Sequence, residues 1–173
     1  ENWCWTVEGL KRLSKHHETG ATLPRDLLDK MLAAKNVNVG LNMARQIYLS
    51  TLDLEIHGTN PPTTAEGLQA LVDRLRPEIS LIENPAGANM LRSFGHLMNQ
   101  YSAAYYGYLW AEVLSADMFA QCFEKDPFDA KAGRRYRDLV LAPGGVGKIL
   151  DHLTTFLGRP PSQEAFLKSR GIA

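Results

Sequence analysis

Apolar side chains recur at helical spacing along almost the whole chain, and no run alternates apolar and polar residues as a half-buried strand does. Glycine and proline interrupt this pattern at 58–62, 84–87 and 143–145, where we expect loops. The sequence therefore predicts an all-α protein of several helices with little or no sheet. At 173 residues, the chain is expected to be a single helical segment, residues 1–173, with a real core.

The expected helices are placed by their apolar residues and their ends. The first is predicted from about Glu1 to His17, and the second opens near Pro24 and breaks around residues 36–40. The later helices carry the following apolar residues: Met43, Ile47, Leu49, Leu52 and Leu54; Leu68, Leu71, Val72 and Leu75; Tyr136, Leu139 and Val140; Ile149, Leu150, Leu153 and Phe156.

Capping residues mark several of these ends. Thr63 with Glu66 is predicted to form a capping box, and Asp129 and Ser162 are placed to cap the helices that follow them. Gly158 stands just past the end of a helix, where a left-handed residue is common.

Composition excludes several classes of function. Nineteen basic and nineteen acidic residues cancel, so neither nucleic acid nor an anionic membrane is an expected partner. No signal peptide or membrane span is visible. Cys4 and Cys122 are expected to be buried thiols in a reducing compartment, which favours a cytoplasmic location.

A histidine followed by closely spaced tyrosines is the richest functional signal. At 100° per residue, Tyr101, Tyr105 and Tyr108 share one helical face, Glu112 extends it, and His96 lies just before it. A phenol is a neutral hydrogen-bond donor at pH 7. A row of phenols beside an imidazole is suited to holding a polar ligand or a developing oxyanion.

The structural alternative for this segment is an amphipathic core helix. Its tyrosine rings would pack inward and their hydroxyls would reach water. Tyr106 and Trp110 fall on other faces of the same predicted helix.

Three other patterns are weaker. The sequence from Pro143 to Lys148 has the glycines of a phosphate loop, but no strand precedes it and no Ser or Thr follows the lysine, so we interpret it as a helix stop and restart. His16 and His17 diverge by 100° on a helix, which favours a surface pair over a metal site. Two further histidines, His57 and His152, show no partners in sequence and are expected to be ordinary surface or satisfied residues.

Three arginines, Arg134, Arg135 and Arg137, could bind a peptide carboxylate, although salt bridges on a solvated face are the preferred interpretation.

Several collinear segments resemble the C-terminal part of the zinc oligopeptidases of the thimet oligopeptidase, neurolysin and peptidyl-dipeptidase family. The resemblance covers almost the whole chain. Its matching segments are residues 1–3, 10–16, 45–47, 94–119, 135–145, 156–161 and 165–171. It implies the C-terminal, multi-helix portion of a helical metallopeptidase catalytic domain that hydrolyses peptide bonds in short peptides.

The resemblance also implies where zinc would be bound. Enzymes of this family hold zinc with a His-Glu-x-x-His helix and a glutamate farther along. The only His-Glu pair here is His17-Glu18, and it lacks the second histidine. We therefore expect zinc in the parent enzyme but no metal ligand in this chain, with the missing N-terminal part as its partner.

The family's functional residues transfer only to matching positions. His96 matches a histidine that contacts substrate near the scissile bond, and Tyr101 and Tyr108 match tyrosines that donate to the tetrahedral intermediate. Tyr105 matches a third phenol lining the same cleft. The family's glycine pair before the first tyrosine is replaced by Met98-Asn99-Gln100, which predicts a stiffer or helical approach to Tyr101.

Two hypotheses follow. In the first, this chain is the substrate-binding part of a zinc oligopeptidase and is inactive alone. In the second, it is a non-catalytic helical module that binds peptide or self-associates, for example as a homodimer, with Trp3 and Trp5 as participants.

Overall fold

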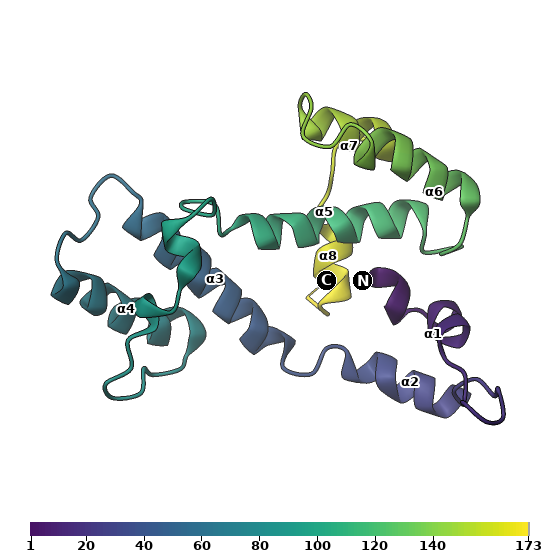
Figure 1. Cartoon of the computed structure of the whole chain (residues 1–173), viewed down its shortest axis with the longest axis horizontal. Coiled ribbons are helices and arrows are strands. Elements are labelled where there is room, and N and C mark those ends of the chain that lie inside the picture. Colours follow the sequence, from purple (N-terminus) through teal and green to yellow (C-terminus); the bar gives the residue numbers. More distant parts are fainter. Residues whose placement is uncertain (173) are drawn as a thin grey trace. The chain divides into compact units, whose positions relative to one another are not determined.

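The computed structural model describes residues 1–172 and confirms the all-α prediction, with no strand among those residues (Figure 1). The elements in chain order are the 3-10 helix η1 (Asn2–Trp5), α1 (Val7–Leu13), α2 (Arg25–Ala34), α3 (Val39–Ile56), α4 (Ala65–Ser80), the 3-10 helices η2 (Met90–Arg92) and η3 (Gly95–Met98), α5 (Gly107–Cys122), α6 (Ala130–Tyr136), the π-helix η4 (Arg137–Leu141), α7 (Ile149–Leu157) and α8 (Glu164–Ser169). No described helix is both long and apolar enough to cross a membrane.

The chain divides into two compact units. Unit 2 is Asn38–Ala111, and unit 1 is Glu1–Val37 together with the residues from Glu112 onward. In unit 2, α3 and α4 lie side by side (Figure 1). Their buried residues form one core with the segment that precedes α5: Tyr48, Leu49, Leu52, Leu71, Val72, Leu75, Phe94, Leu97 and Tyr105.

Unit 1 has its own aromatic core. Phe123, Ala132, Phe156 and Leu157 are buried there, with Trp3 packed against them. The Trp3 ring lies 4.9 Å from that of Phe123, and its indole N–H donates to the backbone carbonyl of Pro127. Trp3 therefore packs within unit 1 and is only partly exposed, whereas Trp5 is exposed.

The first helix is shorter than predicted and broken in two. The 3-10 turn η1 ends at Trp5, and Thr6 then caps α1 by accepting a hydrogen bond from the Gly9 N–H at 3.0 Å. A Cβ on Gly9 would lie 1.9 Å from the Trp3 carbonyl oxygen, so the chain folds back at a place that only glycine permits. The helix ends at Leu13, and His16 and His17 lie beyond it.

Some predicted ends are confirmed and two shift by a residue. The residue that precedes α8 is Gln163 rather than Ser162, although the Ser162 hydroxyl still accepts the Glu164 N–H at 3.2 Å. Asp129 caps α6 through the Lys131 N–H at 2.7 Å, and Gly158 ends α7 at φ 75°. The cap of α4 is Thr64 rather than Thr63, with its hydroxyl accepting from the Gly67 N–H. Both threonines precede the same apolar pattern, and periodicity alone does not choose between them.

The thiols differ from the expectation of two buried cysteines. Cys122 is partly buried, and burial raises its pKa, whereas Cys4 is exposed.

Candidate functional site

The four predicted site residues come together in unit 2. The His96 ring centroid lies 5.3 Å from that of Tyr101, 5.2 Å from Tyr105 and 5.8 Å from Tyr108. The Tyr101 and Tyr108 rings stack at 5.4 Å, and the Tyr108 hydroxyl lies 3.3 Å from His96 Nε2. We call His96, Tyr101, Tyr105 and Tyr108 the tyrosine cluster. It combines one imidazole with three phenols.

A turn, not a helix, builds this cluster. Residues 99–106 are not helical and α5 begins only at Gly107, so the prediction of one continuous helical face is wrong. Local bonds shape the turn: the Ser102 hydroxyl donates to the Leu97 and Asn99 carbonyls at 2.8 and 2.7 Å. Ala103 is left-handed at φ 57°, a conformation that costs an L-residue about 1–2 kcal/mol.

The residues that replace the glycine pair fit this backbone without strain. Among the described residues, the non-glycine positions with positive φ are Asn38, Leu81 and Ala103, so residues 98–100 do not require glycine here. Asn99 is extended, and its side-chain oxygen accepts the Tyr101 N–H at 3.0 Å. The predicted helical approach to Tyr101 is not found.

The three phenols sit in different environments. Tyr105 is buried, with its ring 5.2 Å from that of Phe94. Tyr108 is 40% exposed, and its pKa is raised, first by hydrogen bonding with Tyr101, then by desolvation and by Tyr105. A raised pKa keeps this phenol in its neutral, donating form at pH 7. Tyr106 is also about half exposed but lies outside the cluster.

Glu112, which was predicted to extend the helical face of the tyrosines, is not part of the tyrosine cluster. Its carboxylate accepts a hydrogen bond from the Arg170 guanidinium within unit 1.

Sequence reasoning missed Asp53, the most buried polar residue near the cluster. It lies on α3 with its side chain fully buried, and it accepts the backbone N–H of Ala103 at 3.1 Å and of Tyr105 at 3.0 Å. The Nδ1 of His57 lies 3.0 Å from Asp53 Oδ1 and 2.9 Å from the Asp53 carbonyl oxygen. His57 is therefore a satisfied histidine, one of the two outcomes expected for it. An Asp-x-x-x-His pair next to buried Leu52 was the available signal.

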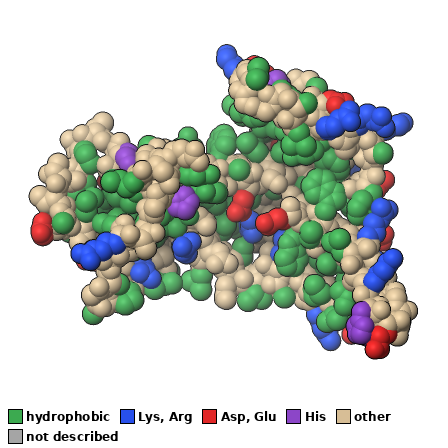
Figure 2. All heavy atoms as spheres, in the orientation of Figure 1, with side chains coloured by type: hydrophobic (Ala, Val, Ile, Leu, Met, Phe, Trp, Pro, Cys, Tyr) green, Lys and Arg blue, Asp and Glu red, His purple; other side chains and the backbone are tan. Residues whose placement is uncertain are grey.

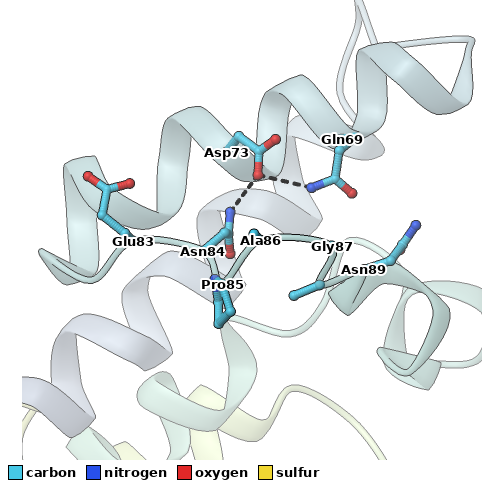
Figure 3. Close-up of a pocket in the computed structure, with 9 residues that line it drawn as sticks. Gln69, Asp73, Glu83, Asn84, Pro85, Ala86, Gly87 and Asn89 are labelled. Atoms are coloured by element: carbon cyan, nitrogen blue, oxygen red, sulfur yellow. Dashed lines mark hydrogen bonds between the residues drawn. The ribbon is translucent and has the colours of Figure 1, made fainter.

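A second carboxylate orders the segment that leads to His96. Asp73 Oδ1 accepts hydrogen bonds from the side-chain amides of Gln69 and Asn84 at 2.9 and 2.7 Å (Figure 3). The Arg76 guanidinium donates to the side-chain Oδ1 of Asn84 at 2.8 Å. Gln69, Asp73 and Asn84 are among the residues that line a polar cavity of about 480 Å³ between α4 and the 83–89 loop. The network fastens the loop to α4.

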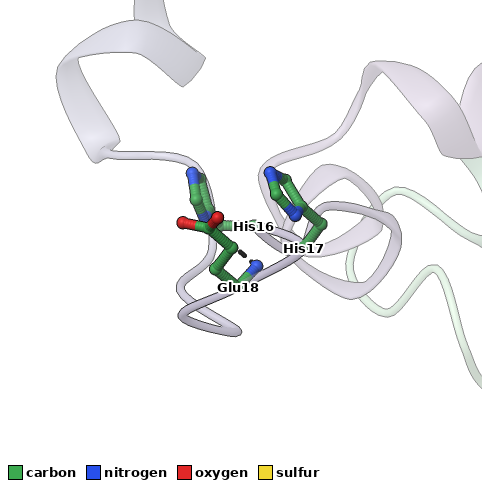
Figure 4. Close-up of side chains that lie close together, drawn as sticks. All are labelled: His16, His17 and Glu18. Carbon is green, nitrogen blue, oxygen red and sulfur yellow. Dashed lines mark hydrogen bonds between the residues drawn. The ribbon is translucent and has the colours of Figure 1, made fainter.

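The described residues include one group with metal-ligand chemistry, His16, His17 and Glu18 (Figure 4). The two imidazoles stack at 4.9 Å in a turn rather than diverging on a helix. All three side chains are exposed, and His16 Nδ1 accepts the N–H of Glu18 and of Thr19, each at 3.3 Å. Because that lone pair is engaged, the group does not fit a catalytic zinc site, which needs three oriented protein ligands.

The remaining weak patterns have structural partners. Arg135 donates to the Phe156 carbonyl at 2.7 Å, and Arg137 pairs with Asp138, which favours the salt-bridge and packing interpretation of the arginines. His152 Nε2 lies 2.8 Å from the Val146 carbonyl oxygen. Gly144, Gly145 and Gly147 lie in the turn between η4 and α7, which agrees with the predicted helix stop and restart.

Comparison with known proteins adds an independent line of evidence. A family model described as peptidase family M3 matches residues 1–172. The chain is 44% identical to saccharolysin of Saccharomyces cerevisiae, over 99% of this chain and 24% of the relative. It is 36% identical to oligopeptidase A of Escherichia coli and 37% identical to a probable cytosolic oligopeptidase A of Arabidopsis thaliana, each over 99% of this chain and 25% of the relative. The chain spans about a quarter of the length of these curated relatives.

Proposed function

Because the chain belongs to peptidase family M3, we propose that its tyrosine cluster forms the substrate-side wall of a peptide-hydrolysing site in a longer oligopeptidase. The family assignment confirms the resemblance found in the sequence. The observation that carries the proposal is the convergence of His96 with three phenols in one unit.

The chemistry of these side chains suits that role. When water adds to a peptide carbonyl, negative charge develops on the carbonyl oxygen, and neutral donors aimed at that oxygen lower the barrier. In the proposal, Tyr108 and Tyr101 donate to this oxygen or to a flanking carbonyl. His96 contacts the substrate near the scissile bond, and Tyr105 forms the buried floor of the wall. The bond between Tyr108 and His96 would exchange for bonds to substrate.

We place zinc in the parent enzyme, held by residues outside 1–172, because the described residues do not supply a fitting ligand set. Short peptides are the proposed substrates, since the matched relatives are named oligopeptidases. A cytoplasmic location is proposed from the name of the cytosolic Arabidopsis relative.

The 173-residue chain alone is expected to retain no zinc at a catalytic site and to cleave no peptide. The test compares it with the full-length parent, using a quenched fluorescent peptide and metal analysis after dialysis. We expect hydrolysis and bound zinc only in the parent. Stoichiometric zinc retained by the short chain, together with chelator-sensitive cleavage, would contradict the proposal.

Exposed apolar residues support the second candidate, a self-associating helical module. Leu13, Leu81 and Met98 are 70%, 84% and 89% exposed. Figure 2 shows apolar side chains at the surface of both units. Such surface favours association when it is contiguous.

The isolated chain is accordingly expected to dimerise or associate further as its concentration rises, with exposed Trp5 rather than Trp3 as a participant. Sedimentation velocity over a range of concentrations measures this, and an apolar dye reports the exposed surface. A strict monomer without dye binding would rule the association out.

A further inference from the structure

We propose that Asp53 is the positioning residue that holds the tyrosine cluster in its working arrangement. Its carboxylate, on α3, accepts hydrogen bonds from the 99–106 turn, which contains Tyr101 and Tyr105 of the tyrosine cluster. This inference rests on the proposed function of that cluster. Because its side chain is fully buried, Asp53 is not placed to contact the substrate. It acts through the backbone of the turn.

The hydrogen bonds are divided between the two carboxylate oxygens. Oδ1 accepts the Ala103 N–H at 3.1 Å and Oδ2 accepts the Tyr105 N–H at 3.0 Å, so the carboxylate grips the turn at two points two residues apart. His57 Nδ1 lies 3.0 Å from Oδ1, but its hydrogen bond is to the backbone carbonyl oxygen of Asp53 at 2.9 Å. Bonds from N–H groups to an ionised carboxylate are among the stronger hydrogen bonds in proteins, especially away from water. Each oxygen of this buried carboxylate therefore has a hydrogen-bond donor, which offsets the cost of burying it.

One of the two hydrogen bonds to Asp53 holds the residue of the turn with the least favourable backbone conformation. Ala103 is left-handed at φ 57°, which an L-residue adopts only when its surroundings impose it. One of the two gripped N–H groups belongs to Ala103 itself, and the other belongs to Tyr105, a member of the cluster. The Ala103 conformation sets the direction of the chain between Tyr101 and Tyr105. Release of the carboxylate is therefore expected to let the turn relax and to separate the phenols.

Asp53→Asn in the full-length parent tests this directly. Asn keeps the shape, but its amide nitrogen cannot accept an N–H, so one of the two bonds is lost. We expect amide exchange in the 99–108 segment to accelerate about 10- to 100-fold, the factor implied by loss of a charge-assisted hydrogen bond. We expect kcat to fall about 10-fold or more with little change in KM, as for a misplaced catalytic group.

A matched control separates positioning from stability. Leu52 is the buried neighbour of Asp53 on α3, and Leu52→Val destabilises the same core while leaving both hydrogen bonds from the turn to Asp53 in place. Leu52→Val is expected to lower Tm but to leave kcat and exchange at 99–108 unchanged well below Tm. If Asp53→Asn and Leu52→Val lower kcat equally, the loss comes from general destabilisation and Asp53 has no specific positioning role.

A second variant provides a rescue. Glycine adopts positive φ freely, so Ala103→Gly lessens the need for the grip. The double variant Asp53→Asn/Ala103→Gly is expected to regain part of the kcat that Asp53→Asn loses. Residues 53 and 103 are 50 positions apart in sequence, so such a rescue would reflect their contact in the fold. Failure of this rescue would count against the proposed mechanism.

The outcomes distinguish this inference from the proposed function. Unchanged exchange at 99–108 in Asp53→Asn overturns the grip, whatever the kinetics. If Tyr108→Phe lowers kcat while Asp53→Asn does not, the positioning role is wrong and the proposed function stands. If exchange accelerates but neither variant changes kcat, the proposed function has failed, and with it the positioning role.

Discussion

Tyr108→Phe in the full-length parent is expected to lower kcat about 10²-fold or more, the scale of a single lost oxyanion donor. KM should change little, because the interaction removed is made mainly in the transition state. The fold should be almost unaffected. Tyr108 is 40% exposed, and the substitution keeps the ring that stacks on Tyr101 and removes only the hydroxyl. Steady-state kinetics with one short peptide, measured beside thermal unfolding, provides both quantities.

Tyr106→Phe is the matched control. Tyr106 lies two residues away and is similarly exposed at 49%, but its ring makes none of the contacts of the tyrosine cluster. Its hydroxyl should therefore be kinetically silent. Should the two substitutions behave alike, the phenols would be a packing feature and the assignment of Tyr108 as a donor would be wrong.

The sequence predicted the members of the cluster better than its backbone. Spacing on an imagined helix placed Tyr101, Tyr105 and Tyr108 together, and the structure brings the same rings together on a turn. The turn depends on Asp53, 50 residues from Ala103, and local periodicity contains no information about so distant an acceptor. The family resemblance identified the residues but did not supply the contact that orients them.

The helices illustrate the same limit on a smaller scale. The apolar spacing predicts the α3 helix and places Ile47 and Leu54 on its apolar side, but each is 47% exposed. Tyr48 and Asp53 are buried instead. Apolar spacing shows that a helix has an apolar side, but the neighbouring helix decides which residues are covered. Likewise, the break before α1 arises from the approach of Gly9 to the Trp3 carbonyl, which becomes apparent only in three dimensions.

A buried ion pair in unit 1 was also invisible in the sequence, because its partners are 42 residues apart. Arg159 donates to both oxygens of Asp117, at 2.8 and 2.6 Å, and the Ser162 N–H donates to the same carboxylate at 2.8 Å. The Asp117 side chain is 3% exposed and that of Arg159 is 39% exposed. These bonds join the segment after α7 to α5.

Asp117→Asn is expected to destabilise the chain by about 3 kcal/mol at pH 7, near the low end for breaking a buried pair because Arg159 is partly exposed. Arg159 is the largest cause that lowers the pKa of Asp117, with the Ser162 N–H adding to it. A lowered folded-state pKa means that the pair contributes stability that is fully present above the unfolded value of about 3.9. This stability is lost as the pH falls through the folded-state pKa.

Urea unfolding followed by circular dichroism at several pH values measures the effect. The difference between wild type and Asp117→Asn should stay constant from pH 7 to about pH 5 and shrink in more acidic solution. Asp138→Asn is the matched control, because Asp138 also pairs with an arginine, Arg137, at 2.7 Å but is 53% exposed. An exposed pair contributes little, so this variant should unfold like wild type. If both variants lose the same stability, burial is not what gives the Asp117 pair its strength.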